Sequence, residues 1–162
     1  MVGFLIFQGG FVSPMRAALY ARVSTHDQQT LAMQMDAMHE FATRRGWTIT
    51  TTVEEIASGA TDRRPQRHAL LTAAKQRKLD VILVWKLDRW GRSLVDLMMT
   101  LHELTALGVG FVSLTEALDL TTPAGRAFAG FLAVFAEFER DLIRERIKAG
   151  ITDARKGSIR SF

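Results

Sequence analysis

A nearly continuous apolar run at positions 80–85, Asp-Val-Ile-Leu-Val-Trp, constrains the fold more than any other part of the sequence. A strand with one face in solvent alternates apolar and polar residues, whereas a strand buried on both faces is apolar almost throughout. Sheets buried on both faces are mostly parallel, because their crossover connections place helices on each side. The run therefore predicts a central strand of a parallel sheet that helices cover on both faces.

Strand-like and helix-like patterns alternate along the chain up to about residue 120. Thr alternates with Ile and Val over 47–56, as in a strand, while Leu31, Met35 and Met38 recur at helical spacing. This order indicates the α/β class, with a layered sheet of mostly parallel strands flanked by helices. The predicted strands are 17–24, 47–56, 80–85 and 109–114, the predicted helices are 28–45, 65–78 and 93–107, and the predicted loops are 57–64 and 86–92.

A long C-terminal helix is expected after the alternating segment. Thr122 precedes Pro123, a pair typical of a helix start, and no further proline occurs up to about residue 156. Such a helix would extend about 50 Å at 1.5 Å per residue, too long to lie within one small domain. The predicted organisation is an N-terminal extension (1–14), an α/β domain (15–120), a projecting helix (121–157) and a tail (158–162).

Two features of the projecting helix indicate partners. Apolar residues spaced 3, 4, 3 and 4 form one seam, which packs either on the helix's own domain or, as we favour, on another subunit. The second case predicts a homodimer or homotetramer. Basic residues follow, and they form either a solvated face or, as we favour, a contact with the DNA backbone. The seam is Phe128, Phe131, Phe135, Phe138 and Leu142, and the expected DNA contacts are Arg144, Lys148, Arg155, Lys156 and Arg160.

Ser24 ends the first predicted strand and follows Arg22 by two residues. Alternate side chains of a strand share a face, so Tyr20, Arg22 and Ser24 are expected to point the same way. In an open α/β sheet the ligand site lies beyond the carboxyl ends of the strands. A hydroxyl beside a guanidinium at that edge is a candidate nucleophile next to an anion-binding group, although a single serine there more often only caps a helix.

A second cluster, Lys-Leu-Asp-Arg-Trp-Gly-Arg-Ser at 86–93, follows the buried strand and is expected at the same edge of the sheet. Its Asp88, Arg89 and Arg92 form either an ordinary surface ion-pair group or a site for a phosphodiester. Guanidinium groups stay charged and bind phosphate oxygens with planar donors, which also stabilises a charged transition state. Arg64, after the second strand, and Lys75, one helix later, are candidates to join them.

Composition excludes several kinds of chemistry. The chain has no cysteine, so it has no disulfide framework, thiolate nucleophile or zinc ribbon. Its four histidines lack ligand spacing, and the sequence shows neither an acidic cluster for two metals nor a glycine-rich phosphate loop. The net charge of +4 favours a polyanionic partner. We therefore expect no metal, no cofactor, no membrane association and a serine-based reaction at a phosphodiester.

Five blocks of sequence occur in an order typical of one protein family. The blocks are Tyr20–Ser24, Ser58-Gly59 with Asp62 and Arg64-Pro65, Leu83–Ser93, Thr121–Arg126 and Phe135–Arg146. They lie between about residues 15 and 156, so they cover nearly the whole chain. Each block alone is a weak signal, but together they make the chain resemble the catalytic domain of the serine recombinases, the resolvase/invertase family, which includes serine integrases and related transposases.

The resemblance implies a role for each matching residue. Ser24 is implied to be the nucleophile that attacks a DNA phosphate, giving a 5′-phosphoserine link and a free 3′-hydroxyl. Asp88 is implied to organise the arginines around the phosphate or to carry a proton. The phosphoserine ester retains the energy of the cleaved bond, so rejoining needs no ATP. The implied phosphate-binding arginines are Arg22, Arg64, Arg89 and Arg92, and the implied supporting residues are Tyr20, Gln29, Gln34, Lys75, Arg140 and Arg146.

The function implied by the resemblance is site-specific recombination of double-stranded DNA, in the cytoplasm of a bacterium and with a phage or mobile element as the origin. One alternative is a DNA-binding or assembly module that keeps the fold and has lost the chemistry. Another is a small-molecule α/β protein of flavodoxin or response-regulator type, which would need a phosphate-cradling loop or an acidic pocket after the first strand. Positions 25–30 contain no glycine and one acid, Asp27, which disfavours that class.

Some features depart from the family pattern. Trp90 stands where leucine is usual, and Arg63 before Arg64 leaves the arginine assignment in that loop open by one position. Family members carry DNA-binding domains after the long helix, whereas this sequence ends at Phe162. We therefore expect a catalytic fragment, a truncated product or a protein that borrows recognition from a partner. Residues 1–14 are apolar and glycine-rich, and we expect a poorly ordered upstream extension or cloning remnant.

Overall fold

The computed structural model describes residues 13–24, 30–57 and 64–159. Within these ranges the chain forms a sheet of five strands in the order β2-β1-β3-β4-β5, of which the first four are parallel and β5 is antiparallel. The prediction of a mostly parallel α/β sheet is confirmed. The strands are β1 (Arg16–Ser24), β2 (Thr48–Ala57), β3 (Val81–Val84), β4 (Gly110–Ser113) and β5 (Leu118–Asp119).

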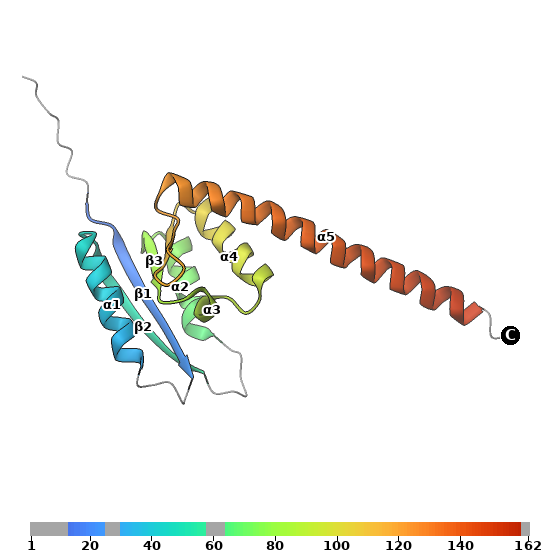
Figure 1. The fold of residues 1–162 in the computed structure, drawn as a ribbon, viewed down its shortest axis with the longest axis horizontal. Coiled ribbons are helices and arrows are strands. Elements are labelled where there is room, and N and C mark those ends of the chain that lie inside the picture. Colours follow the sequence, from blue (N-terminus) through green and yellow to red (C-terminus); the bar gives the residue numbers. More distant parts are fainter. Residues whose placement is uncertain (1–12, 25–29, 58–63, 160–162) are drawn as a thin grey trace, which may run out of the picture.

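Helices cover both faces of the sheet (Figure 1). Their ends differ by a few residues from the predicted ends, and two elements were not predicted: β5, and a short helix inside the segment 86–92 that the sequence analysis assigns to a loop. Within the described ranges, no helix combines the length and the apolar character needed to cross a membrane. The helices are α1 (Leu31–Arg44), α2 (Pro65–Lys75), α3 (Leu87–Trp90), α4 (Leu94–Ala106) and α5 (Pro123–Ile159).

The central strand β3 is buried at every position, as its apolar sequence predicts. Alternate side chains enter two separate cores. Tyr20 and Ile82 pack on the side of α2, α3 and α4, whereas Leu19 and Leu83 pack on the side of α1. Successive residues of a strand point to opposite faces, so a fully apolar strand supplies both cores at once.

The long helix α5 has 37 residues and therefore extends about 55 Å. Thr122 caps its start, because the Thr122 hydroxyl oxygen accepts a hydrogen bond from the Gly125 N–H at 3.0 Å. The first turns pack on α4 and β5, and the rest projects away from the α/β body (Figure 1). This confirms the predicted C-terminal helix.

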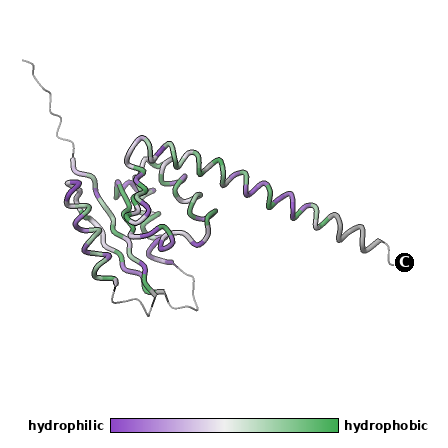
Figure 2. Tube along the Cα trace, in the orientation of Figure 1, coloured by the Kyte–Doolittle hydropathy of each residue, from purple (hydrophilic) through white to green (hydrophobic). Residues whose placement is uncertain are grey.

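The apolar seam of α5 lies largely in solvent. Phe128, Phe131 and Phe138 are 49%, 68% and 56% exposed, and Phe135 is 42% exposed. Apolar and polar residues continue to alternate along the projecting part of the helix (Figure 2). Exposed aromatic residues in a row are typical of an interaction surface. That a second subunit covers this seam remains a prediction.

Gly125 determines how closely α5 approaches the sheet. A Cβ atom at this position would lie 1.8 Å from the carbonyl oxygen of Asp119, which is a backbone atom of β5. Backbone cannot move aside as a flexible side chain can, so only glycine fits here without displacing the helix.

We therefore expect Gly125→Ala to lower the free energy of unfolding by about 1–3 kcal/mol, the usual cost of an overpacked position. Gly130→Ala is the matched control, since it lies in the same helix and its Cβ would have no neighbour within 4 Å. Removing that glycine should stabilise the helix by up to about 1 kcal/mol. Urea unfolding of the two variants measures both effects, and equal stability of the two would contradict the packing argument.

Candidate active site

The carboxyl end of β1 extends beyond its neighbour β3. Val84, the last residue of β3, is in register with Tyr20, whereas β1 continues to Ser24, which pairs with Ala57 of β2. The final residues of β1 therefore border the segment that follows β3. The side chain of Ser24 lies outside the described part of the structure, and its role as nucleophile remains a prediction.

The short helix α3 follows β3 almost directly and carries Asp88 and Arg89. The side of α3 that faces the core carries the Trp90 ring, which is fully buried. This ring meets the Tyr20 ring edge-on with the centroids 5.2 Å apart, and its centroid lies 5.5 Å from that of Phe111. Trp90 thus anchors α3 over β1, as expected for two segments that end at the same edge of the sheet.

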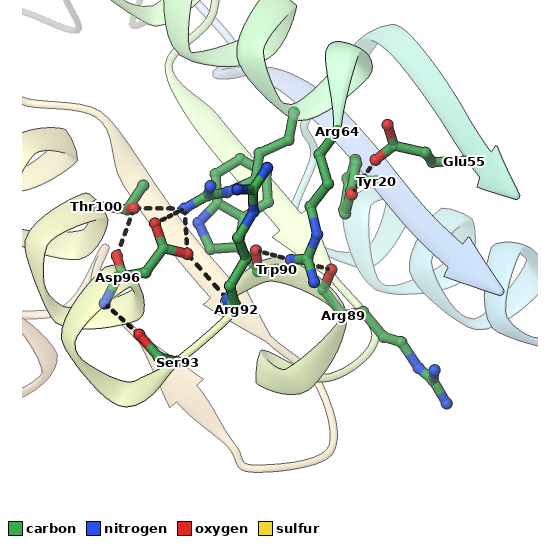
Figure 3. A network of polar contacts seen from close by, with 10 residues as sticks. Tyr20, Glu55, Arg64, Arg89, Trp90, Arg92, Ser93, Asp96 and Thr100 are labelled. Atoms are coloured by element: carbon green, nitrogen blue, oxygen red, sulfur yellow. Dashed lines mark hydrogen bonds and ion pairs between the residues drawn. The ribbon is translucent and has the colours of Figure 1, made fainter. Parts of the chain in front are cut away.

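The outer side of α3 presents the charged groups. The side chain of Asp88 is 65% exposed, and its carboxylate lies 3.6 Å from the Nε of Arg89, whose side chain is 28% exposed. Arg92, just after the helix, is also exposed. In Figure 3 the guanidinium of Arg89 points away from the other labelled side chains. Asp88 and Arg92 are therefore exposed and Arg89 is half-buried, and the role of all three at a phosphate remains a prediction.

Hydrogen bonds from other elements hold the backbone of this segment (Figure 3). A carboxylate oxygen of Glu116 accepts the N–H of Leu87 at 3.2 Å, at the start of α3. A carboxylate oxygen of Asp96 accepts the N–H of Arg92 at 2.9 Å, after its end. Between them, Nη1 of Arg64 donates to the carbonyl oxygen of Trp90 at 2.6 Å. Both ends of the segment that carries Asp88, Arg89 and Arg92 are thereby fixed.

Arg64 is placed differently from what the sequence suggests. The sequence analysis assigns it to the phosphate-binding arginines, but the residue is only 7% exposed. Its guanidinium also lies 3.4 Å from the Arg89 carbonyl oxygen, so it donates to backbone oxygens of α3. In this structure Arg64 holds the backbone of Arg89 and Trp90 through their carbonyl oxygens. Its contact with a phosphate remains a prediction.

Tyr20 and Glu55 form a buried pair under the end of β1. The Tyr20 hydroxyl donates a hydrogen bond to the Glu55 carboxylate, and Glu55 lies across from Arg22 in the register of β1 and β2. Burial raises the pKa of Tyr20 well above its ordinary value, and Glu55 raises it further. The charges of Arg64 and Arg22 act against this rise, so both lie within electrostatic reach of the hydroxyl. The supporting role predicted for Tyr20 fits these contacts.

Arg67 of α2 forms a second buried network that the sequence analysis missed. The residue is 8% exposed, and its guanidinium lies 5.2 Å from the centroid of the Trp90 ring. Its Nη2 donates to the Asp96 carboxylate at 3.1 Å and to the Thr100 hydroxyl at 2.6 Å. Burial alone would raise the pKa of Asp96, but the Arg92 N–H and the Arg67 charge outweigh burial, and that pKa lies below its ordinary value.

The missed residues differ in the signal that their sequence carries. Glu55 follows Val53 by two residues in a strand, and both are buried, so an acid in register with a core position was a usable signal. Asp96 follows Ser93 by three residues, which indicates a helix cap: its N–H donates to the Ser93 hydroxyl at 3.2 Å. Arg67 carries no such signal, because a polar residue on an amphipathic helix normally faces solvent.

The remaining predicted residues lie away from this cluster or outside the described ranges. Lys75 ends α2 and pairs with Glu103 of α4 at 2.8 Å, so its expected place beside the arginines is wrong in this structure. Gln34 is buried and donates to the Thr30 hydroxyl at 3.1 Å. On α5, Arg144 binds Asp141 at 3.3 Å, Arg140 is partly buried, and Arg146 and Lys148 are exposed, whereas Gln29, Arg160 and the side chains of Arg155 and Lys156 are outside the description.

Comparisons with known proteins agree with this fold. A family model described as "Resolvase, N terminal domain" matches residues 17–158. A DNA-invertase of Enterobacteria phage P7 is 39% identical over 136 residues, which are 84% of this chain and 68% of that protein. The serine recombinase gin of Escherichia phage Mu is 38% identical over 141 residues, 86% of this chain and 68% of the relative. A solved resolvase family site-specific recombinase from Streptococcus pneumoniae superposes with a TM-score of 0.71 at 26% identity, covering 87% of this chain and 99% of its own.

The depressed pKa of Asp96 leads to a pH-dependent stability. A carboxyl group whose pKa is lower in the folded protein stabilises the fold above its unfolded pKa of about 3.9, and the stabilisation is lost as the pH falls through the folded pKa. At pH 7 we expect Asp96→Asn to lower the free energy of unfolding by about 2–3 kcal/mol, because the buried guanidinium of Arg67 loses its counter-charge. This difference from the wild type should shrink below about pH 4.

Urea unfolding between pH 7 and pH 3 provides the measurement. Asp141→Asn is the control, since it removes an ion-pair carboxylate whose side chain is 60% exposed. Exposed pairs contribute at most about 1 kcal/mol, so this control should stay near the wild type. A difference for Asp96→Asn that is constant over the whole pH range would contradict the charge-based explanation.

Proposed function

This chain belongs to the resolvase family, and from that premise we propose that it is the catalytic domain of a site-specific DNA recombinase. The observation that carries the proposal is the family match over residues 17–158. It includes the two segments that meet at the carboxyl edge of the sheet, the end of β1 with Ser24 and the segment 87–92. The relatives named above are a DNA-invertase, a serine recombinase and a resolvase family recombinase.

The proposed reaction is an attack of the Ser24 hydroxyl on a DNA phosphate. The bond between the serine oxygen and phosphorus forms while the bond from phosphorus to the 3′ oxygen breaks. The serine gives up its proton and the 3′ oxygen takes one up, which leaves a 5′-phosphoserine link and a free 3′-hydroxyl. One phosphoester replaces another, so a 3′-hydroxyl can reverse the step without ATP.

The guanidinium groups of Arg22, Arg89 and Arg92 are proposed to bind the phosphate in this step. Charge builds up on the non-bridging oxygens in the transition state, and fixed donors stabilise it best when they need no reorganisation. The hydrogen bonds that hold both ends of the segment 87–92 support this assignment. Asp88 is proposed to orient Arg89, whose Nε lies 3.6 Å from its carboxylate. Because guanidinium groups supply the positive charge, we propose that the reaction is independent of metal.

Double-stranded DNA and a second copy of the chain are the proposed partners. The seam of α5 exposes four phenylalanines, and burying each is worth about 1.5–3 kcal/mol. A homodimer or homotetramer through α5 would cover them. Arg144, Arg146 and Lys148 are exposed further along the same helix, where cations can contact DNA phosphates.

Replacing the nucleophile tests the chemistry. We expect Ser24→Ala to abolish the covalent protein–DNA adduct, while the fold and the oligomeric state stay unchanged. The measurement is incubation of the protein in EDTA with duplex DNA of random sequence, followed by denaturation and detection of label attached to protein. A 5′-phosphoserine link requires that 3′-end label becomes protein-bound and that 5′-end label does not.

Ser13→Ala is the control for this experiment, because Ser13 is an exposed serine near the start of β1 and should react normally. An adduct that persists in Ser24→Ala, or that carries the 5′-end label, would overturn the proposed nucleophile or the polarity of the reaction. A wild type that binds DNA but forms no adduct would favour the assembly module that lacks the chemistry.

A charge in the seam of α5 tests the proposed assembly. Phe135→Asp should weaken self-association at least about tenfold, because it removes a buried aromatic side chain from the interface and introduces a charge. Gly150→Asp is the control: it adds the same charge to an exposed position of α5 that does not follow the spacing of the seam and where a Cβ has no neighbour within 4 Å. Analytical ultracentrifugation measures both. A wild type that stays monomeric at high concentration would contradict the assembly, as would equal effects of the two substitutions.

A further inference from the structure

Trp90 occupies an unusual position for a residue between two proposed phosphate-binding arginines. Its side chain is fully buried, and two of its neighbours are the aromatic rings of Tyr20 and Phe111. The indole nitrogen is buried and has no hydrogen-bond partner within the described ranges. The ring is therefore held by packing, so its surroundings decide how α3 is oriented.

The guanidinium of Arg67 lies over this ring, 5.2 Å from its centroid. A cation within about 6 Å of an aromatic centroid is attracted by the negative face of the ring, and tryptophan gives the strongest attraction. Arg67 is 8% exposed, so its interaction with the ring is shielded from water. A buried charge is costly unless it has partners, so Arg67 depends on those around it. It has no access to a ligand on the outer side of α3.

Arg67 is also connected to Arg92 through one carboxylate. The Arg67 guanidinium lies 3.0 Å from Oδ2 of Asp96, and this same oxygen accepts the Arg92 N–H at 2.9 Å. The buried Arg67 guanidinium thus contacts the ring of Trp90, which precedes Gly91. Through the Asp96 carboxylate it is also connected to the backbone of Arg92, which follows Gly91. Arg89 precedes Trp90 directly, so Arg67 contacts the side chain next to Arg89 and the carboxylate that binds the Arg92 backbone.

We propose that Arg67 is a positioning residue for the cleavage step and that it acts as a coupled pair with Trp90. The proposal rests on the proposed function and goes beyond it, because Arg67 does not contact the phosphate. The cation fixes the Trp90 ring and the Asp96 carboxylate together, and these set the direction in which Arg89 and Arg92 leave the backbone. Small displacements of catalytic donors have large effects on rate, since transition-state charge is stabilised only at the right distance.

A double-mutant cycle tests the coupling. Arg67→Met removes the charge and keeps most of the length of the side chain, Trp90→Leu removes the ring, and the double variant removes both. The readouts are the unfolding free energy, the Kd for a labelled duplex and the single-turnover cleavage rate at saturating DNA, expressed per folded molecule. Lys78→Met is the matched control, since it removes an exposed cation that follows the same helix and belongs to no part of the proposed site.

For Arg67→Met we expect a cleavage rate at least about tenfold lower with a Kd for DNA within about twofold of the wild type. Arg67→Lys, which keeps the cation, should recover part of the rate, and Lys78→Met should not change the rate. The double variant should be no slower than the slower single variant, because one interaction is lost only once. A wild-type rate per folded molecule in Arg67→Met, or rate losses that multiply in the double variant, would overturn the proposal.

Hydrogen exchange of the peptide that spans residues 86–93 gives a readout independent of cleavage. The Arg92 amide, bonded to Asp96, should exchange faster in Arg67→Met and remain protected in Lys78→Met. Unchanged protection in Arg67→Met would overturn the coupling even if no variant cleaved DNA. Absence of the Ser24 adduct in the wild type, by contrast, would contradict the proposed function and leave the exchange result to decide this inference. If Arg67→Met does not fold, Arg67→Lys is compared with the wild type instead, and a smaller increase in the exchange of the Arg92 amide is expected.

Discussion

The site depends on the burial of a single aromatic ring. Trp90 is the last residue of a helix of four residues, which is too short to be stable by itself. The edge-on contact of Trp90 with Tyr20 and its tilted contact with Phe111 attach this helix to the two neighbouring parts of the core. The buried ring thereby fixes a short helix that carries the exposed Asp88 and the half-buried Arg89. The hydrogen bonds from Arg64, Asp96 and Glu116 then fix its ends.

The arginines around α3 divide into two kinds by their depth. Arg64 and Arg67 are 7% and 8% exposed, and they bind backbone carbonyl oxygens, Asp96 and the Trp90 ring. Arg89 and Arg92 lie on the outer side and leave their charge accessible. Buried cations are costly without partners, so the inner pair depends on these contacts, whereas the outer pair can bind an anion from solvent.

The sequence predicted what depends on periodicity and on strand ends. The apolar run at 80–85 identified the central strand, and the positions of Ser24 and of the segment 86–93 after two strands placed them at one edge of the sheet. What it did not predict depends on tertiary burial. Helix α3 is shorter than any pattern can reveal, and Arg67 is identical in sequence terms to a solvent-facing residue. Lys75 shows the converse. Its position at the end of the helix after Arg64 suggested a place beside the arginines, but α2 ends near the amino end of β3, whereas the arginines follow the carboxyl end of that strand.

The base of the long helix and the start of α3 share one support, the turn between β4 and β5. Glu116 in this turn binds the Leu87 N–H and also accepts a hydrogen bond from the Ser113 hydroxyl. A few residues later, the Asp119 backbone is where α5 makes its closest approach, at Gly125. A cavity of about 580 Å³ lies between these elements, with Leu87, Glu116, Gly125 and Phe128 among its lining residues. Glu116 therefore connects the turn that supports the base of α5 with the first residue of the helix that carries Asp88 and Arg89.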